Sequence, residues 1–209
     1  MAGQINEVSI FDYALSSSQV TTLWGGGTSV SNPMALPSPP IAYYPLGGSA
    51  AAFRTPVNTG DQWLIENNAI GDYVFDFDGT GDKITSVSNS GLTSSDARTF
   101  SAWIKTTDTG NNRTVVQTGP DSTNNNFELS TYGGFLHFSS WGTYNFTGNV
   151  AIADGDWHFI CITFDGSVIN GYVDGNSAGP NLTNASATLA TTNTPYYLGG
   201  SATGNSAKY

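Results

Sequence analysis

The chain has 209 residues, of which 38% are hydrophobic and only 11% are charged, against roughly 25% in an ordinary soluble domain. Sixteen acidic and six basic residues give a formal charge of −10, which argues against nucleic-acid binding and against attachment to an anionic membrane surface. The lone cysteine, Cys161, excludes an intramolecular disulfide and a cysteine-based zinc site. The length suits one large all-β domain, and the absence of a run of ~18 apolar residues argues against membrane insertion.

The first predicted elements are a strand and a short helix. Residues 5–11 alternate in the manner of a strand, and the Ser16-x-x-Gln19 capping box ahead of Val20 predicts a helix of one or two turns. Residues 25–40, rich in Gly, Ser and Pro, are typical of an extended linker. We therefore expect a small structured segment at 1–24, a linker at 25–40 and the main body at 41–209.

The body shows period-two patterning with β-branched and aromatic residues, separated by Asp-Gly and Gly-Gly turn signals. This spacing predicts an all-β fold, a two-sheet antiparallel β-sandwich of the jelly-roll type with one short helix. The strands expected in the body are Ile41–Leu46, Tyr73–Phe77, Thr99–Ile104, Phe127–Ser130, Phe135–Ser139, Phe159–Phe164, Ile169–Val173 and Tyr196–Leu198.

Four motifs carry a family resemblance. They are Asp76–Ile84 (DFDGTGDKI), Thr99–Ile104 (TFSAWI), Asp154–Phe159 (DGDWHF) and Gly171–Gly175 (GYVDG). Their order and spacing resemble the concanavalin A-like lectin/glucanase superfamily, in its laminin G-like branch. The resemblance implies an extracellular recognition module that binds glycans or protein surfaces.

Residues 3–16 are similar to the closing strand and helix of that family, yet here they stand first, so the order resembles a circular permutation. Three explanations compete: a permuted domain, a window from a tandem array, or a subunit whose N-terminal strand completes its neighbour. A sandwich without its closing strand would expose a sheet edge and apolar core, so some segment must occupy that place.

The N-terminal segment is too apolar to remain in water, because burying each large side chain is worth roughly 1.5–3 kcal/mol. We expect it to dock beside Tyr196–Leu198 and Tyr209, on its own body or on a copy of the same domain. Docking between copies, which would build a head-to-tail fibre, is the version we favour. The docking residues are Ile5, Val8, Ile10, Phe11, Leu15 and Trp24.

Catalytic carboxylates are not evident. Retaining glycosidases hold two carboxylates ~5–5.5 Å apart, but Glu7, Glu66 and Glu128 have no acidic partner two or four positions away. We interpret them as surface or structural groups and expect no enzyme activity. His137 and His158 lack the partner spacing of a metal site or a catalytic triad, and we expect hydrogen-bonded strand histidines.

A metal site has weak support. The resemblance implies an occasional structural Ca²⁺, but Asn6 stands where the family often has an aspartate, which removes a charge from that site. Asp78 and Asp82 are the other candidate ligands, and ordinary turn acids are the simpler interpretation. We expect no required cofactor.

Sugar recognition uses planar aromatic rings together with amides or carboxylates. Tyr132, Trp141, Tyr144 and Asn145 offer that mixture, which we place on loops, although core packing explains Trp141 equally well. The sequence thus predicts a non-catalytic structural or adhesive unit of a cell surface, virion surface, fibre or tandem array, with glycan or protein-surface recognition. The alternatives are a stand-alone lectin-like domain and, third, a glycoside hydrolase.

Overall fold

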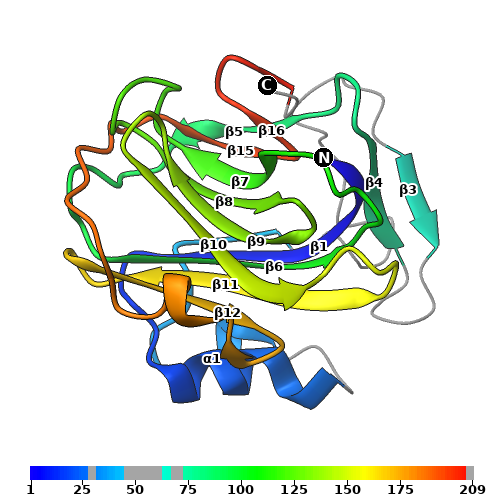
Figure 1. Cartoon of the computed structure of the whole chain (residues 1–209), viewed down its shortest axis with the longest axis horizontal. Helices are drawn as coiled ribbons and strands as arrows, with labels where there is room; N and C mark the ends of the chain where they lie inside the picture. Colours follow the sequence, from blue (N-terminus) through cyan, green and yellow to red (C-terminus); the bar gives the residue numbers. More distant parts are fainter. Residues whose placement is uncertain (28–31, 45–62, 67–72, 206–209) are drawn as a thin grey trace.

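The computed structural model describes residues 1–27, 32–44, 63–66 and 73–205. Two antiparallel sheets pack face to face as a sandwich, so the predicted fold class is confirmed (Figure 1). Sheet A runs in the order β13 (Asn176–Ser177), β12 (Val168–Val173), β11 (Trp157–Phe164), β6 (Arg98–Lys105), β1 (Ala2–Phe11), β4 (Tyr73–Asp78) and β3 (Trp63–Glu66), with β2 (Ala42–Tyr44) also on β1 and β14 (Ala185–Ser186) on β12.

Sheet B covers one face of sheet A. Its order is β10 (Tyr144–Ala151), β9 (Phe135–Ser140), β8 (Phe127–Tyr132), β7 (Arg113–Thr118), β15 (Pro195–Leu198) and β5 (Ile84–Asn89). A short hairpin of β16 (Gly200–Ser201) and β17 (Gly204–Asn205) follows β15.

The central core lies between the two sheets and consists of the inward side chains of both. Phe100 of β6 meets Phe127 of β8 edge to face, with ring centroids 4.8 Å apart. Ile5, Val8 and Ile10 of β1 belong to the same core and are fully buried. Such burial removes the alternating apolar face of each strand from water, which is the main force that holds a sandwich together.

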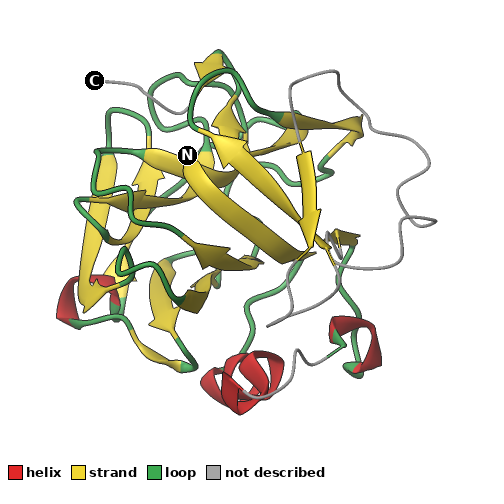
Figure 2. Cartoon of the chain, turned by 90° about the vertical axis from the view of Figure 1, so that its right-hand side faces the viewer, coloured by secondary structure: helices red, strands yellow, loops and turns green. Residues whose placement is uncertain are grey.

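A second core lies on the opposite face of sheet A, beneath helix α1 (Ser17–Trp24). Figure 2 shows this helix apart from the strands, at the lower side of the molecule. Val20 and Leu23 of α1 pack with Phe11, Trp103 and, in the same cluster, Leu15, Phe159 and Cys161. Sheet A is therefore covered on both faces, and its central strands are buried on both sides.

The helix begins and ends as its sequence predicts. The Ser16 hydroxyl accepts a hydrogen bond from the Gln19 amide while the Gln19 side chain accepts one from the Ser16 amide, which confirms the capping box. Gly25 ends the helix in the left-handed conformation, with φ of 67°. Short 3-10 turns follow at Gly25–Gly27 and Pro33–Ala35, and another lies at Pro180–Leu182.

The N-terminal strand docks at a different place from the one expected. β1 lies between β6 and β4, where Ile5 stands opposite Ile104 on one side and Phe75 on the other. The expected position beside Tyr196–Leu198 is wrong, because that strand, β15, lies in sheet B between β7 and β5. Tyr209 lies outside the described residues. The reason is that β1 is buried on both faces, with Ile5, Val8 and Ile10 in the central core and Phe11 in the outer one, which suits a central strand of the doubly covered sheet.

The predicted body strands are all present. The strands that were not predicted are β3, β5, β7 and β10, together with the two-residue strands β13, β14, β16 and β17. Of the predicted strand Ile41–Leu46, residues 42–44 form β2, and 45–46 lie outside the described residues. The placement of Tyr144 and Asn145 on a loop is wrong, since both belong to β10. Asn, Thr and Gly dominate this largely exposed strand and hide its alternation.

Arg98, at the start of β6, is fully buried. Its guanidinium donates hydrogen bonds to the carbonyls of Thr93, Ser94 and Asp96 at 3.1, 3.0 and 2.7 Å, and its Cζ lies 5.4 Å from the ring centroid of Phe127. Burial lowers the pKa of Arg98 to about 10, so the group stays charged at neutral pH. It fixes residues 93–96 against the end of the sandwich.

Candidate functional site on the outer face of sheet B

The outer face of sheet B carries a row of polar side chains that crosses four strands. Gln117, Glu128, Ser139 and Asn145 stand opposite one another in the ladders of β7, β8, β9 and β10. They face away from the core because their neighbours Phe127, Leu129 and Phe138 point into it. The register thus collects residues that are distant in sequence into one line.

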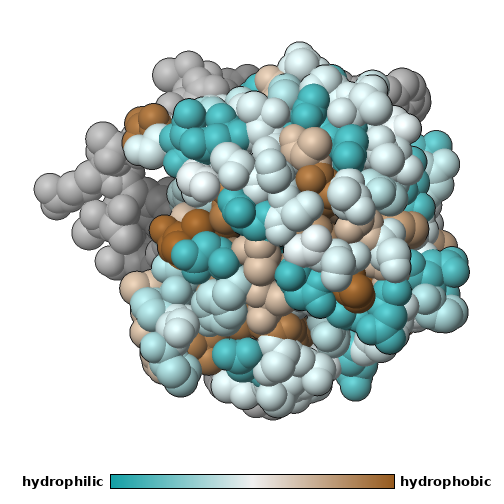
Figure 3. Space-filling model, turned by 90° about the vertical axis from the view of Figure 1, so that its left-hand side faces the viewer, coloured by the Kyte–Doolittle hydropathy of each residue, from teal (hydrophilic) through white to brown (hydrophobic). Residues whose placement is uncertain are grey.

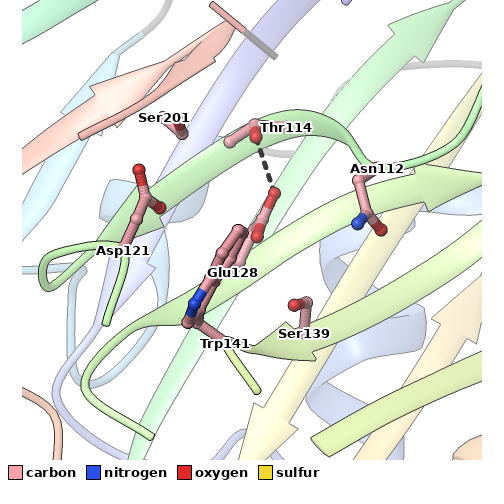
Figure 4. A pocket seen from close by; sticks show the side chains of 7 residues that line it. All are labelled: Asn112, Thr114, Asp121, Glu128, Ser139, Trp141 and Ser201. Carbon is pink, nitrogen blue, oxygen red and sulfur yellow. Dashed lines mark hydrogen bonds between the residues drawn. The ribbon is translucent and has the colours of Figure 1, made fainter. Parts of the chain in front are cut away.

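A shallow pocket opens above this row; its cavity volume is only about 10 Å³, so a ligand would lie across its mouth. Figure 4 shows Glu128 and Trp141 at its centre, with Asp121 and Ser201 toward one side and Asn112 and Ser139 toward the other. The lining is almost entirely polar except for the indole ring. An apolar plane beside hydroxyl, amide and carboxylate groups is the combination that binds a sugar ring.

Hydrogen bonds fix the two carboxylates of the pocket. Glu128 is 6% exposed, and its Oε1 accepts a hydrogen bond from the Thr114 hydroxyl at 2.6 Å. Asp121 accepts from Gln117 Nε2 at 2.9 Å and from the Thr203 hydroxyl and amide at 2.6 and 3.0 Å. These bonds fix the orientation of both carboxylates at the pocket wall.

Trp141 occupies the turn between β9 and β10 and is half-buried. Its backbone amide donates to Oδ1 of the buried Asn126 at 2.6 Å, so the turn is tied to the segment before β8. The side chain lines the pocket rather than the central core. This geometry pre-orients the ring at the pocket wall.

The structure brings three of the four expected glycan-binding residues onto one face. Asn145 lies beside Ser139 in the polar row, and Tyr132, 39% exposed, contacts His137 with ring centroids 5.2 Å apart and the ring planes tilted by 34°. Tyr144 points the other way: its ring packs against the central core, and its hydroxyl accepts from the Thr188 amide at 3.0 Å. Tyr144 therefore lies outside this site.

His137 lies under Tyr132 on the same face and is 2% exposed. Its Nδ1 lies 2.8 Å from the Thr147 hydroxyl, and burial lowers its pKa to about 4. The imidazole is therefore neutral at physiological pH and supports Tyr132 as a flat, uncharged platform.

His158 has the opposite character and lies at the start of β11, in sheet A. Its two ring nitrogens meet Asp174 at 2.7 Å and Asp154 at 3.2 Å, and the hydrogen bond to Asp174 is the largest cause of its raised pKa. Asp174 also accepts from the Phe159 amide at 2.9 Å. This cluster fixes the turn at Asp174-Gly175, on which α1 rests.

The other glutamates lie elsewhere. Glu7 sits at a β-bulge of β1 with φ of 51°, accepts a hydrogen bond from the Tyr43 hydroxyl, and has a pKa raised by burial. Glu66 belongs to β3, and its side chain lies outside the described residues. The acidic residue that lines the pocket with Glu128 is Asp121. The β7–β8 hairpin brings the two together, so the spacing of acidic residues along one strand does not predict this pair.

The candidate metal ligands do not all converge. Asp82 Oδ2 accepts from the Asp78 amide at 2.9 Å, within the turn that follows β4. Asn6 lies on β1 four residues beyond Ala2, the residue paired with Asp78, and therefore about 13 Å away along the strand. Among the described residues no group of three or more His, Cys, Asp or Glu side chains is arranged to hold a metal ion.

The chain belongs to the concanavalin A-like lectin/glucanases superfamily, whose family model matches residues 78–209. No curated protein matches it. Domain 4 of AbnA, a GH43 extracellular arabinanase from Geobacillus stearothermophilus solved in complex with arabinotriose, is similar in fold, with 16% identity over 68% of each chain and a TM-score of 0.52. Mouse laminin α1 domains LG4-5 align with a TM-score of 0.41 and 18% identity, over 53% of this chain and 30% of theirs. In the described part of the chain, no helix is long and apolar enough to span a membrane.

Proposed function

We propose that this domain is a non-catalytic extracellular module that binds a glycan on the outer face of sheet B and serves as an adhesive unit of a cell or virion surface. The observation that carries the proposal is the Trp141 ring beside the polar row of Gln117, Glu128, Ser139 and Asn145. The superfamily membership supports it, as does the sugar-bound state of the structurally similar arabinanase domain.

Among the described residues, the side of the molecule at the left of Figure 1 carries no large apolar patch. Figure 3 shows one side of the molecule on which hydrophobic patches are small and separated by hydrophilic or neutral residues. Large contiguous apolar patches are what mark protein docking surfaces. In its described residues, this end of the sandwich therefore lacks the kind of large apolar patch that marks a protein docking surface (Figure 3).

The hydrogen bonds of the pocket support binding rather than glycoside hydrolysis. Both oxygens of Asp121 accept bonds that hold the β16–β17 hairpin and Gln117, and Glu128 is held by Thr114. A glycosidase instead needs one carboxyl group as an acid and another as a nucleophile or base, flanking an open cleft. The pocket offers a fixed acceptor surface, which serves recognition.

The test is a glycan array with the full chain, followed by titration of the hits. We expect Trp141→Ala to weaken binding at least tenfold, about 1.4 kcal/mol, and Tyr144→Phe, on the opposite face of β10, to bind as the parent does. Binding that survives Trp141→Ala unchanged would contradict the site. Turnover of a bound glycan that disappears in Glu128→Gln would instead favour the hydrolase alternative.

A further inference from the structure

The N-terminal segment, residues 1–24, is an insert into a body formed by later residues. We infer that the same place in sheet A accepts residues 1–24 of a second copy of this chain, so that neighbouring copies exchange the segment. This inference concerns assembly and is independent of glycan binding.

The place that β1 occupies is a gap between two strands of the body. β1 pairs with β6 from Gln4 to Phe11 and with β4 from Ala2 to Ile5. Without β1, β6 and β4 would each present a row of unpaired amides and carbonyls at the centre of the sheet. Open edges of this kind recruit another strand.

The segment is also buried on both of its faces. Ile5, Val8 and Ile10 enter the central core, while Phe11 and Leu15, followed by α1, enter the outer core. An empty gap would therefore expose apolar surface on both sides of sheet A. The body needs an occupant, and any copy of the segment offers identical contacts.

The connection to the body does not restrict the segment to its own chain. The Ile41 amide donates to the Ile10 carbonyl at 2.8 Å, yet residues 12–41 lie between these two partners. A two-residue hairpin would fix such a pairing within one chain. A connection of this length supplies only an effective concentration of the segment, on the order of millimolar, with which neighbouring copies compete.

The connection also contains a point at which the chain can change direction. Gly25, Gly26 and Gly27 have φ of 67°, 73° and 74°, values that glycine adopts without strain. A side chain at Gly26 would meet nothing within 4 Å, so space is open on that side of the chain. When each copy donates its segment to the next, a contact that does not close gives a head-to-tail chain of domains.

Disulfide trapping distinguishes docking within a chain from docking between chains. Gln4 of β1 stands opposite Lys105 of β6, and directly opposed residues of antiparallel strands are close enough for a disulfide. The variants Gln4→Cys and Lys105→Cys are co-expressed as separate full-length chains and oxidised at a series of concentrations. A disulfide between positions 4 and 105 can then form only between two chains.

We expect a cross-linked pair of chains that becomes more abundant at high protein concentration, identified by the peptide that joins positions 4 and 105. The matched control pairs Gln4→Cys with Ser88→Cys, an exposed position on β5 of sheet B, and reports random collisions. The double variant Gln4→Cys/Lys105→Cys in one chain reports the docking itself. An intrachain link in the double variant, with no excess of interchain link over the control, would overturn the inference. A double variant that forms no disulfide between positions 4 and 105 would also overturn the inference, because β1 and β6 would then not pair with Gln4 opposite Lys105.

Discussion

The Nδ1 atom of His158 lies 2.7 Å from Oδ2 of Asp174, and this pair holds the turn against which α1 packs. Thr21 of α1 donates a hydrogen bond to the Gly175 carbonyl of that turn at 3.2 Å, and Trp24 lies against the same glycine. A titratable pair in sheet A is thereby connected to the docked N-terminal segment.

The two histidines should titrate far apart. Hydrogen bonds to Asp174 and Asp154 raise the pKa of His158 above 6.5, while burial lowers that of His137 to about 4. An NMR titration of the imidazole carbon protons, assigned with a His137→Gln variant, should show these two separate transitions. Two titrations close to 6.5 would contradict the environments described for both residues.

The stability of the fold should respond to pH through both groups, with opposite signs. The raised pKa of His158 contributes stability that is present below pH 6.5 and lost as pH rises through its folded pKa. The lowered pKa of His137 removes stability as pH falls from 6.5 toward 4. His158→Gln should lower Tm by about 1–4 °C at pH 6 and by less at pH 9, measured by thermal unfolding. An equal loss at both pH values would exclude an ionic role for His158.

Removing the buried guanidinium should destabilise the fold strongly. Arg98→Met leaves the carbonyls of Thr93, Ser94 and Asp96 without their donor, and we expect a loss of about 2–4 kcal/mol in the free energy of unfolding. Lys105→Met, which removes a half-buried cation from the other end of β6, should cost less than about 1 kcal/mol. Chemical denaturation measures both values. Comparable losses would mean that the hydrogen bonds of Arg98 contribute little.

The contact between α1 and the Asp174-Gly175 turn can be tested with two glycines of matched backbone geometry. Gly175 and Gly26 have φ of 72° and 73°, so alanine costs the same backbone strain at both positions, about 1 kcal/mol. At Gly175 the new Cβ would also lie 2.7 Å from Cε3 of Trp24, whereas at Gly26 it would meet nothing. Gly175→Ala should therefore displace α1, and Gly26→Ala should not.

The readout is the buried thiol of Cys161, which lies in the outer core beneath α1. Reaction with a thiol reagent should be faster in Gly175→Ala than in the parent, because the displaced helix uncovers the outer core. Gly26→Ala should react at the parental rate. Equal rates in all three proteins would show that α1 does not depend on this turn.

The fold could be predicted from the sequence because strand alternation and helix capping are local patterns that the structure retains. Alternation identified the strands around Phe100, Phe127 and Ile160, and the Ser16–Gln19 capping box located α1. Alternation did not reveal where β1 docks, because it shows which side chains of a strand are buried and not which strands lie beside it. Only the register, which places Ile5 opposite both Ile104 and Phe75, resolves that choice.

The candidate site was predicted in part. Trp141 and Asn145 were found from their chemistry, since a ring and an amide in a polar stretch are typical sugar ligands. The sequence did not identify Asp121, Asn112 and Ser201 as pocket residues, because each reaches the pocket through a different turn or hairpin. Tyr144 was misplaced because the alternation of β10, which sends its ring to the core, is obscured by exposed Asn and Gly residues.

The most direct test of the glycan site is chemical-shift mapping on the ¹⁵N-labelled full chain, titrated with the best-binding oligosaccharide from the array. We expect the largest chemical-shift changes at the backbone amides of Gln117, Glu128, Ser139, Trp141 and Asn145 and at the Trp141 indole. Saturable binding whose perturbations instead map to α1 and the outer face of sheet A would contradict it.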